Sequence, residues 1–178
     1  MRVIGGKYRR RLLDFPDGAG LRPTPDRVRE TLFNWLGQDL HGWVCLDLFA
    51  GSGALGFEAA SRGAARVVMI ERNREALAAL ARNRAALGAS EVDIVPGDAL
   101  SWLAANHQMF DLVFADPPFE NGSAEPLLVR LGEHVRPGGY VYVEQGTSCA
   151  APPGFIIHRS GRAGRSHFAL LRKEEHAC

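Results

Sequence analysis

The residues best suited to chemistry stand together in the segment FADPPF, residues 114–119, which closes an apolar run. Pro117 and Pro118 fix two φ angles and remove two backbone donors, so the segment predicts a stiff, exposed turn at the end of a buried strand. A carboxylate, a rigid carbonyl and an aromatic ring then lie side by side, at Asp116, Pro117 and Phe119. Such acceptors can polarise the N–H bonds of an exocyclic amine on a base that stacks on the ring. The alternative interpretation is a turn that only ends a strand.

A glycine-rich segment upstream offers a place for a cofactor. Residues 47–56 read DLFAGSGALG, in which three glycines satisfy GxGxxG, and Glu71 lies twenty residues after Gly51. Taken alone, this pattern favours NAD. Asp47, however, stands at a strand end, where a buried carboxylate needs a cationic or donor partner. S-Adenosylmethionine carries an ammonium group and no pyrophosphate, so Asp47 favours this methyl donor.

The same cofactor gives roles to the residues around it. The glycines would let the backbone approach the ligand closely, and Glu71 would accept hydrogen bonds from both ribose hydroxyls. Asp98 follows the third expected strand and could accept from the adenine amino group, while Ala99 offers a backbone N–H to the ring. Asp98 could equally be the N-cap of a helix that runs through Trp102. The two roles are compatible.

Alternating strands and helices are needed to bring these residues together. Five apolar runs alternate with helical patterns, as expected of βαβ units on a parallel sheet. The runs lie at residues 43–49, 65–70, 92–95, 110–115 and 140–144. The clearest helix is expected between Asn73, as N-cap, and Gly88, as C-terminal stop. Another is expected after Thr24 as its cap, before the first core strand.

Both ends of the chain have a different pattern. Residues 154–160 and 165–172 flank the turn GRAG and predict an antiparallel β-hairpin at one edge of the sheet. The first thirteen residues are expected to form another short hairpin around Gly5 and Gly6.

Composition narrows the class of protein. The 178 residues are 46% hydrophobic, which predicts one domain, with a small terminal extension, that buries a full core. The odd number of cysteines, without CxxC spacing, supports neither a disulfide framework nor a zinc site, and the six histidines show no ligand spacing. We therefore expect no metal. The apolar runs are shorter than a membrane span and the N-terminus lacks a secretory pattern, so we expect a cytoplasmic protein without a membrane partner.

Charge is distributed unevenly along the chain. Residues 1–30 carry eight Lys and Arg against four Asp and Glu, residues 31–154 carry eight against fourteen, and residues 155–178 carry five against two. Two basic ends around an acidic middle suggest that the ends meet a polyanion, although Arg-rich ends can also be simply solvated.

Taken together, DLFAGSGALG, Glu71, GDAL and DPPF resemble the motifs of class I amino methyltransferases. With RPTPDRVRETLFNWL and the opening RVIGGKYRRRLL, nearly the whole chain resembles the RsmD family of bacterial 16S ribosomal RNA guanine-N2 methyltransferases. The resemblance implies an α/β, Rossmann-like fold with a mostly parallel seven-stranded sheet and an antiparallel C-terminal hairpin. It divides the chain into a basic extension, residues 1–23, and a methyltransferase domain, residues 24–178.

The resemblance also implies an activity and its residues. The reaction is methyl transfer from S-adenosylmethionine to the N2 amine of a guanine in 16S ribosomal RNA, within the small subunit or an assembly intermediate, by a monomer. The expected catalytic residues are Asp116, Pro117, Pro118 and Phe119. The expected cofactor-binding residues are Asp47, Phe49, Ala50, Gly51, Ser52, Gly53, Glu71, Arg72, Asp98 and Ala99. The expected RNA-binding residues are Arg2, Lys7, Arg9, Arg10, Arg11, Arg22, Arg162 and Arg165.

Other functions remain open at this point. Asp116 as an acceptor suits guanine, whose N1 and N2 carry only donors, but DPPF-type loops also serve adenine-N6 methyltransferases on DNA or RNA. A NAD-dependent oxidoreductase would need a hydride-side acid or base that the sequence does not show. A noncatalytic RNA-binding module would leave Asp47 and DPPF without a purpose.

Overall fold

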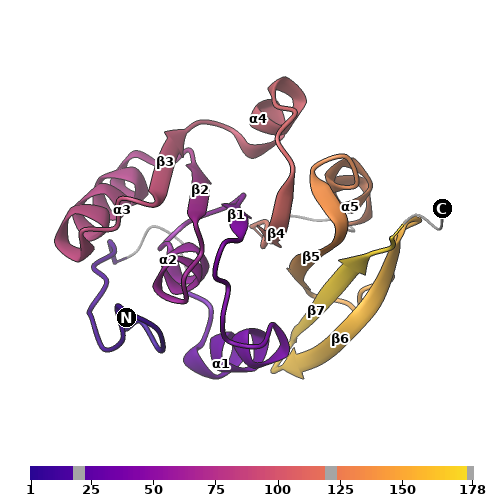
Figure 1. The fold of residues 1–178 in the computed structure, drawn as a ribbon, viewed down its shortest axis with the longest axis horizontal. Coiled ribbons are helices and arrows are strands. Elements are labelled where there is room, and N and C mark those ends of the chain that lie inside the picture. Colours follow the sequence, from indigo (N-terminus) through magenta and orange to yellow (C-terminus); the bar gives the residue numbers. More distant parts are fainter. Residues whose placement is uncertain (18–22, 119–123, 176–178) are drawn as a thin grey trace.

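The computed structural model describes residues 1–17, 23–118 and 124–175, and these residues build one mixed sheet with helices on both faces (Figure 1). Its seven described strands are β1 (Val44–Asp47), β2 (Arg66–Glu71), β3 (Val92–Pro96), β4 (Phe110–Ala115), β5 (Val135–Gln145), β6 (Phe155–Ala163) and β7 (Ser166–Lys173). They lie in the order β3-β2-β1-β4-β5-β7-β6. The first five are parallel, and β7 is antiparallel to both β5 and β6. The expected fold class is confirmed.

The helices begin and end close to where the sequence predicts. The described helices are α1 (Asp26–Trp35), α2 (Ala54–Ser61), α3 (Arg74–Leu87), α4 (Ala99–Ala105) and α5 (Glu125–Leu131). The Asn73 side chain caps α3 by accepting from Ala76 N, and Gly88 ends it with φ +64°, as predicted. The cap expected at Thr24 is wrong. Pro25 holds the N-cap position of α1 with φ −54° and ψ 147°, without a side-chain cap hydrogen bond.

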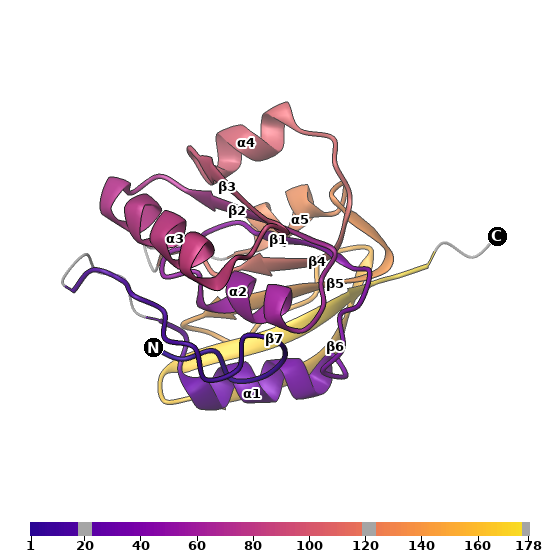
Figure 2. The same cartoon turned by 60° about the vertical axis from the view of Figure 1, so that its left-hand side comes forward.

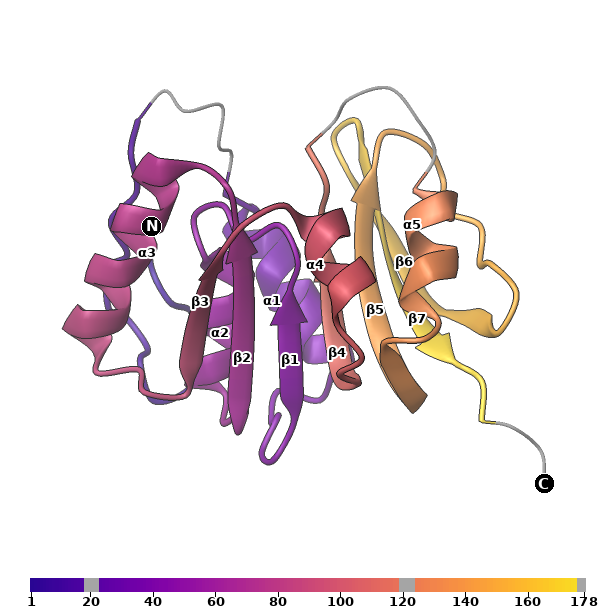
Figure 3. The same cartoon turned by 90° about the horizontal axis from the view of Figure 1, so that it is seen from above.

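Two apolar layers sandwich the sheet. Along β1, Cys45 points to the layer formed with α1, α2 and α3, and Leu46 points to the layer formed with α4 and α5. Figures 2 and 3 show these two groups of helices on opposite sides of the strands. Because side chains alternate along a strand, Asp47 returns to the side of α2.

Strand β5 is longer than its apolar run. It begins at Val135, which pairs with Phe110 of β4, and the register then shifts so that Tyr140 pairs with Leu112. The predicted C-terminal hairpin is confirmed as β6 and β7, with a register irregularity between Ile157 and Arg159.

The N-terminal arm, residues 1–13, folds back on itself less regularly than expected. An isolated antiparallel bridge joins Arg2 to Leu12, and Val3 N donates to Arg11 O at 3.0 Å. The expected short hairpin is therefore reduced to one bridge, because residues 5–6 form a bend and residues 7–10 form a turn. Val3, Tyr8 and Leu13 of the arm are buried in the α1–α2–α3 layer.

A buried carboxylate holds the arm against α2. Glu58 is fully buried and accepts from Ile4 N at 3.0 Å and from Gly5 N at 2.8 Å. Its charge is balanced by Arg29 at 3.3 Å and Arg62 at 3.0 Å. The backbones also meet closely beside this network: a Cβ at Gly6, whose φ is +76°, would stand 1.9 Å from Ser61 O.

Candidate active site

Parallel strands bring the predicted acidic residues to one edge of the sheet. Asp47 ends β1, Glu71 ends β2, Asp98 follows β3, and Asp116 follows β4. In an open α/β sheet, ligands bind outside these carboxyl ends, near the point where the strand order reverses. Here the order reverses between β1 and β4, so Asp47 and Asp116 stand on either side of the reversal.

Asp47 is a buried carboxyl group that accepts a single hydrogen bond from the described residues. Only 3% of the residue is exposed. Oδ2 accepts from Gly56 N at 3.0 Å. Burial and the Glu71 charge together raise the pKa of Asp47 to about 7, although the hydrogen bond from Gly56 N opposes the rise. Such a group can receive a cation, because ionisation then gains a partner.

The loop between β1 and α2 contains the predicted cofactor residues. Phe49, Ala50, Gly51, Ser52 and Gly53 form this loop, and Ala50 N donates to Ile70 O at 3.0 Å, which ties the loop to β2. Gly51 and Gly53 have positive φ angles, which favour glycine.

Two glycines of the pattern are also required by internal packing. A Cβ at Gly53 would lie 2.6 Å from Leu80 Cδ2, and one at Gly56 would lie 2.4 Å from Met69 Cε. The sequence interpretation assigned the glycines to close approach of a ligand, whereas Gly53 and Gly56 admit no Cβ because of neighbouring protein atoms.

Glu71 holds the loop in position. Its carboxylate accepts from Gly51 N at 2.7 Å and from Arg72 N and Asn73 N at 2.9 Å each. The side chain therefore joins the glycine loop to the turn after β2, and it is partly exposed. Arg72 is exposed beside it.

Asp98 is the N-cap of α4. Its carboxylate accepts from Ser101 N at 2.9 Å and from Ser101 Oγ at 3.0 Å. These bonds, the Ser101 N–H first, lower the pKa of Asp98. The capping interpretation is confirmed, and the contact with adenine stays a prediction, as does the role of Ala99, the first residue of α4.

Asp116 lies at the end of β4 in an acidic environment. Burial, together with the charges of Glu144 and Asp47, raises its pKa to about 8. Within the described residues no Lys or Arg side chain forms an ion pair with it. Pro117 is partly exposed and Pro118 is exposed, while Phe119, the predicted stacking residue, falls outside the described part of the chain.

The sequence interpretation did not single out Glu144. This residue lies near the end of β5, and Tyr142 Oη donates to its Oε2 at 3.2 Å. The signal was available, since Glu144 closes the run YVYVE in the same way that Glu71 closes ARVVMIE.

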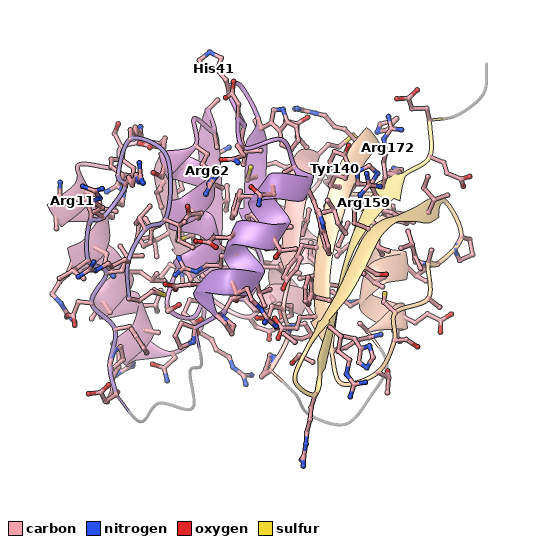
Figure 4. The ribbon with its side chains drawn as sticks, turned by 90° about the horizontal axis from the view of Figure 1, so that it is seen from below. Arg11, His41, Arg62, Tyr140, Arg159 and Arg172 are labelled. Atoms are coloured by element: carbon pink, nitrogen blue, oxygen red, sulfur yellow. The ribbon has the colours of Figure 1, made fainter. Side chains whose placement is uncertain are left out.

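The predicted RNA-binding residues fall into two groups. Lys7 pairs with Glu91 at 2.6 Å and Arg11 donates to Ala86 O at 2.6 Å, so both also support the fold. The remaining described members are exposed at the surface: Arg2, Arg9, Arg10, Arg162 and Arg165. Arg22 lies outside the described residues. Figure 4 shows Arg11 on one side of α1, and Arg159 and Arg172 of the C-terminal hairpin on the other.

Residues 1–17, 23–118 and 124–175 contain no group of three or more His, Cys, Asp and Glu side chains arranged to hold a metal ion. None of the helices described in those ranges is long and apolar enough to cross a membrane.

Comparison with known proteins identifies the family of this chain. The family model for "Conserved hypothetical protein 95" matches residues 1–172. Ribosomal RNA small subunit methyltransferase D of Escherichia coli K12 is 41% identical over 179 residues, which cover 98% of this chain and 90% of that protein. The protein of the same name from Haemophilus influenzae is 42% identical over 150 residues, covering 81% of this chain and 78% of that protein.

Solved structures are similar to this chain over almost its whole length. The structure of the protein yhhF from Escherichia coli has a TM-score of 0.89 and 41% identity, with 98% of each chain covered. The structure of a protein from Thermus thermophilus has a TM-score of 0.81 and 30% identity, covering 98% of this chain and 99% of that chain. With its seven-stranded sheet, its glycine loop and its DPPF segment, this chain belongs to the RsmD family of methyltransferases.

Proposed function

We propose that this protein transfers the methyl group of S-adenosylmethionine to the exocyclic N2 amine of a guanine in 16S ribosomal RNA. The observation that carries the proposal is the position of Asp116 and Pro117. They follow β4 at the edge of the sheet where Asp47 and the glycine loop lie. The names of the relatives, ribosomal RNA small subunit methyltransferase D, support the choice of RNA.

The residues present fit this methyl donor. The buried Asp47 carboxyl has one described donor, Gly56 N, and capacity to accept from an ammonium group. In this proposal the Glu71 carboxylate accepts hydrogen bonds from the ribose hydroxyls, and Asp98 and Ala99 contact the adenine ring. When bound, S-adenosylmethionine supplies a methyl group on a positively charged sulfur, which an amine nitrogen can attack.

The DPP segment orients the amine. Its lone pair is delocalised into the base, so acceptors aimed at the N–H bonds are needed to align the nitrogen. The ionised Asp116 carboxylate and the Pro117 carbonyl are these acceptors, and Pro118 keeps them rigid. Asp116 can also take the proton that the nitrogen loses, since its pKa of about 8 makes it a stronger base than an ordinary aspartate. Phe119 would stack on the base.

The basic ends would hold the RNA around this site. Arg9, Arg10 and the hairpin residues Arg162 and Arg165 are exposed and positively charged, which suits contact with phosphates. In this proposal residues 1–23 act as a basic extension of the methyltransferase domain. The substrate is the small subunit or one of its assembly intermediates, and the enzyme acts as a monomer in the cytoplasm.

The test combines chemistry with mapping. The purified protein is incubated with methyl-labelled S-adenosylmethionine and small subunits from cells that lack this protein, and the labelled nucleosides are identified by mass. We expect label in N2-methylguanosine at one position of 16S RNA. Asp116→Ala should abolish transfer while cofactor affinity stays nearly unchanged. Label in N6-methyladenosine, or none in 16S RNA, would overturn the proposal.

A further inference from the structure

The carboxylate of Glu144 lies beside that of Asp116 at the candidate active site. β4 and β5 are parallel and pair Ala115 with Val143, so the next residues along the two strands, Asp116 and Glu144, reach the carboxyl edge together. The side chains alternate across each strand, which places both carboxylates on the face that also contains Asp47. The Glu144 charge is one cause of the raised pKa of Asp116, which agrees with this placement.

Glu144 is held in one orientation. The buried Tyr142 hydroxyl donates to Glu144 Oε2 at 3.2 Å. Burial, with the neighbouring Glu144 and Asp116 charges, raises the pKa of Tyr142, so the hydroxyl stays protonated and remains a donor. The Tyr142 ring is itself fixed between Phe114 and Phe168, with 6.5 Å between ring centroids in each pair. Among the described residues no hydrogen bond is made to Glu144 Oε1, which leaves it available to a ligand.

No cation offsets the charges of these two carboxylates in the part of the chain that the structure describes. In the described ranges neither Asp116 nor Glu144 forms an ion pair with a Lys or Arg side chain. Adjacent like charges in a partly buried place destabilise the folded protein. Such arrangements are typical of sites that receive a ligand. Because the two acceptors are side by side, the matching ligand has two adjacent donors.

Guanine has that pattern, whereas adenine does not. The N1–H and the N2 amine of guanine are neighbouring donors, while adenine presents a lone pair at N1. We propose that Glu144 accepts a hydrogen bond from N1–H of the target guanine while Asp116 accepts from its N2 amine. Glu144 is then the residue that makes the site select guanine. This inference rests on the proposed function and adds a specificity-determining residue to it.

The test uses a base that separates the two contacts. 2-Aminopurine keeps the N2 amine but has a lone pair at N1, which a carboxylate repels. Subunits are reconstituted with RNA that carries guanosine or 2-aminopurine at the mapped position, and kcat/KM is measured for each. The wild-type protein should prefer guanosine by about 10- to 100-fold, as one specific base contact allows. In Glu144→Gln, the amide can donate to N1 while its oxygen keeps the bond to Tyr142, so the preference should fall below about threefold.

Controls distinguish the possible outcomes. Glu133→Gln makes the same chemical change at an exposed residue between α5 and β5, and it should keep the wild-type preference. Glu144→Ala serves as a second variant, which also lacks the N1–H acceptor and should also lose the preference. If guanosine is not methylated by the wild-type protein, the proposed function fails. If guanosine is methylated and Glu144→Gln retains the wild-type preference over 2-aminopurine, only the role of Glu144 is overturned.

Discussion

Replacing Asp47 by asparagine should stabilise the ligand-free protein, and increasingly so as the pH rises. The unfolded chain releases the Asp47 proton near pH 3.9, whereas burial raises its pKa in the folded protein to about 7. Between these values the folded state binds more protons than the unfolded state. The free energy of unfolding therefore decreases as the pH rises from about 4 to about 7.

The size of the effect follows from the difference between the two pKa values. A difference of about 3 pH units at about 1.36 kcal/mol each amounts to roughly 4 kcal/mol above pH 7. Asparagine has the same shape, can still accept from Gly56 N and stays neutral at every pH. The variant should match the wild-type protein near pH 4 and exceed its melting temperature by roughly 8 to 16 °C at pH 8, for a domain of this size.

The measurement is thermal unfolding of both proteins without ligand, in matched buffers from pH 4 to pH 8. Asp98→Asn is a matched control, because Asp98 is exposed, its pKa is lowered, and asparagine also caps helices well. Asp98→Asn should show no gain in melting temperature over the wild-type protein as the pH rises. A difference between Asp47→Asn and the wild-type protein that is constant from pH 4 to pH 8 would refute the assignment of a buried, high-pKa carboxyl at Asp47. Thermal unfolding in the presence of S-adenosylmethionine extends the test, since the ligand should raise the melting temperature of the wild-type protein far more than that of Asp47→Asn.

Three further predictions concern ligand binding and catalysis. Glu71→Ala should weaken S-adenosylmethionine binding by about 1 to 3 kcal/mol in a calorimetric titration, because the ribose contacts are missing and the glycine loop is no longer held. An unchanged affinity would show that Glu71 does not bind the cofactor. For the wild-type enzyme, kcat/KM should rise with pH and level off above about 8, because the ionised form of Asp116 is the acceptor; a profile that is already flat at pH 6.5 would contradict this role. A triple alanine variant in the arm should lower the slope of log RNA affinity against log salt by about 0.7 to 0.9 for each phosphate that is no longer neutralised. Its cofactor affinity should stay the same. A slope equal to that of the wild-type protein would mean that these charges are only solvated. The three positions of this variant are Arg9, Arg10 and Arg11.

The sequence predicts the sheet and its acidic edge because both depend on local patterns. A short apolar run ending in an acidic residue indicates a buried strand and a functional strand end, and this pattern led to Asp47, Glu71 and Asp116. Glu144 ends the same kind of apolar run, but its position beside Asp116 depends on the pairing of β5 with β4, which no local pattern shows. That pairing exists only once the chain has folded.

Other features depend on contacts between distant segments. Residues 135–139 read VRPGG, which is not a strand pattern, yet Val135 joins β5 by pairing with Phe110 of β4. The cap of α1 was misplaced because Thr24 is a strong capping residue by type, whereas the backbone makes Pro25 the N-cap. A glutamate in the middle of a short helix would ordinarily be expected at the surface. Glu58 is buried because its partners come from α1 and from the arm.

The buried Glu58 makes the arm and α2 a single cooperative unit. The arm amides of Ile4 and Gly5 donate to this carboxylate, so the arm cannot separate from α2 without leaving a buried charge poorly satisfied. In hydrogen exchange these two amides should be protected as strongly as those in the second turn of α2, although they lie near the chain start. Exchange as fast as in a frayed terminus would contradict this. An arm that is already ordered in the free protein loses little conformational entropy when it meets RNA, so more of the energy of its phosphate contacts remains available as affinity.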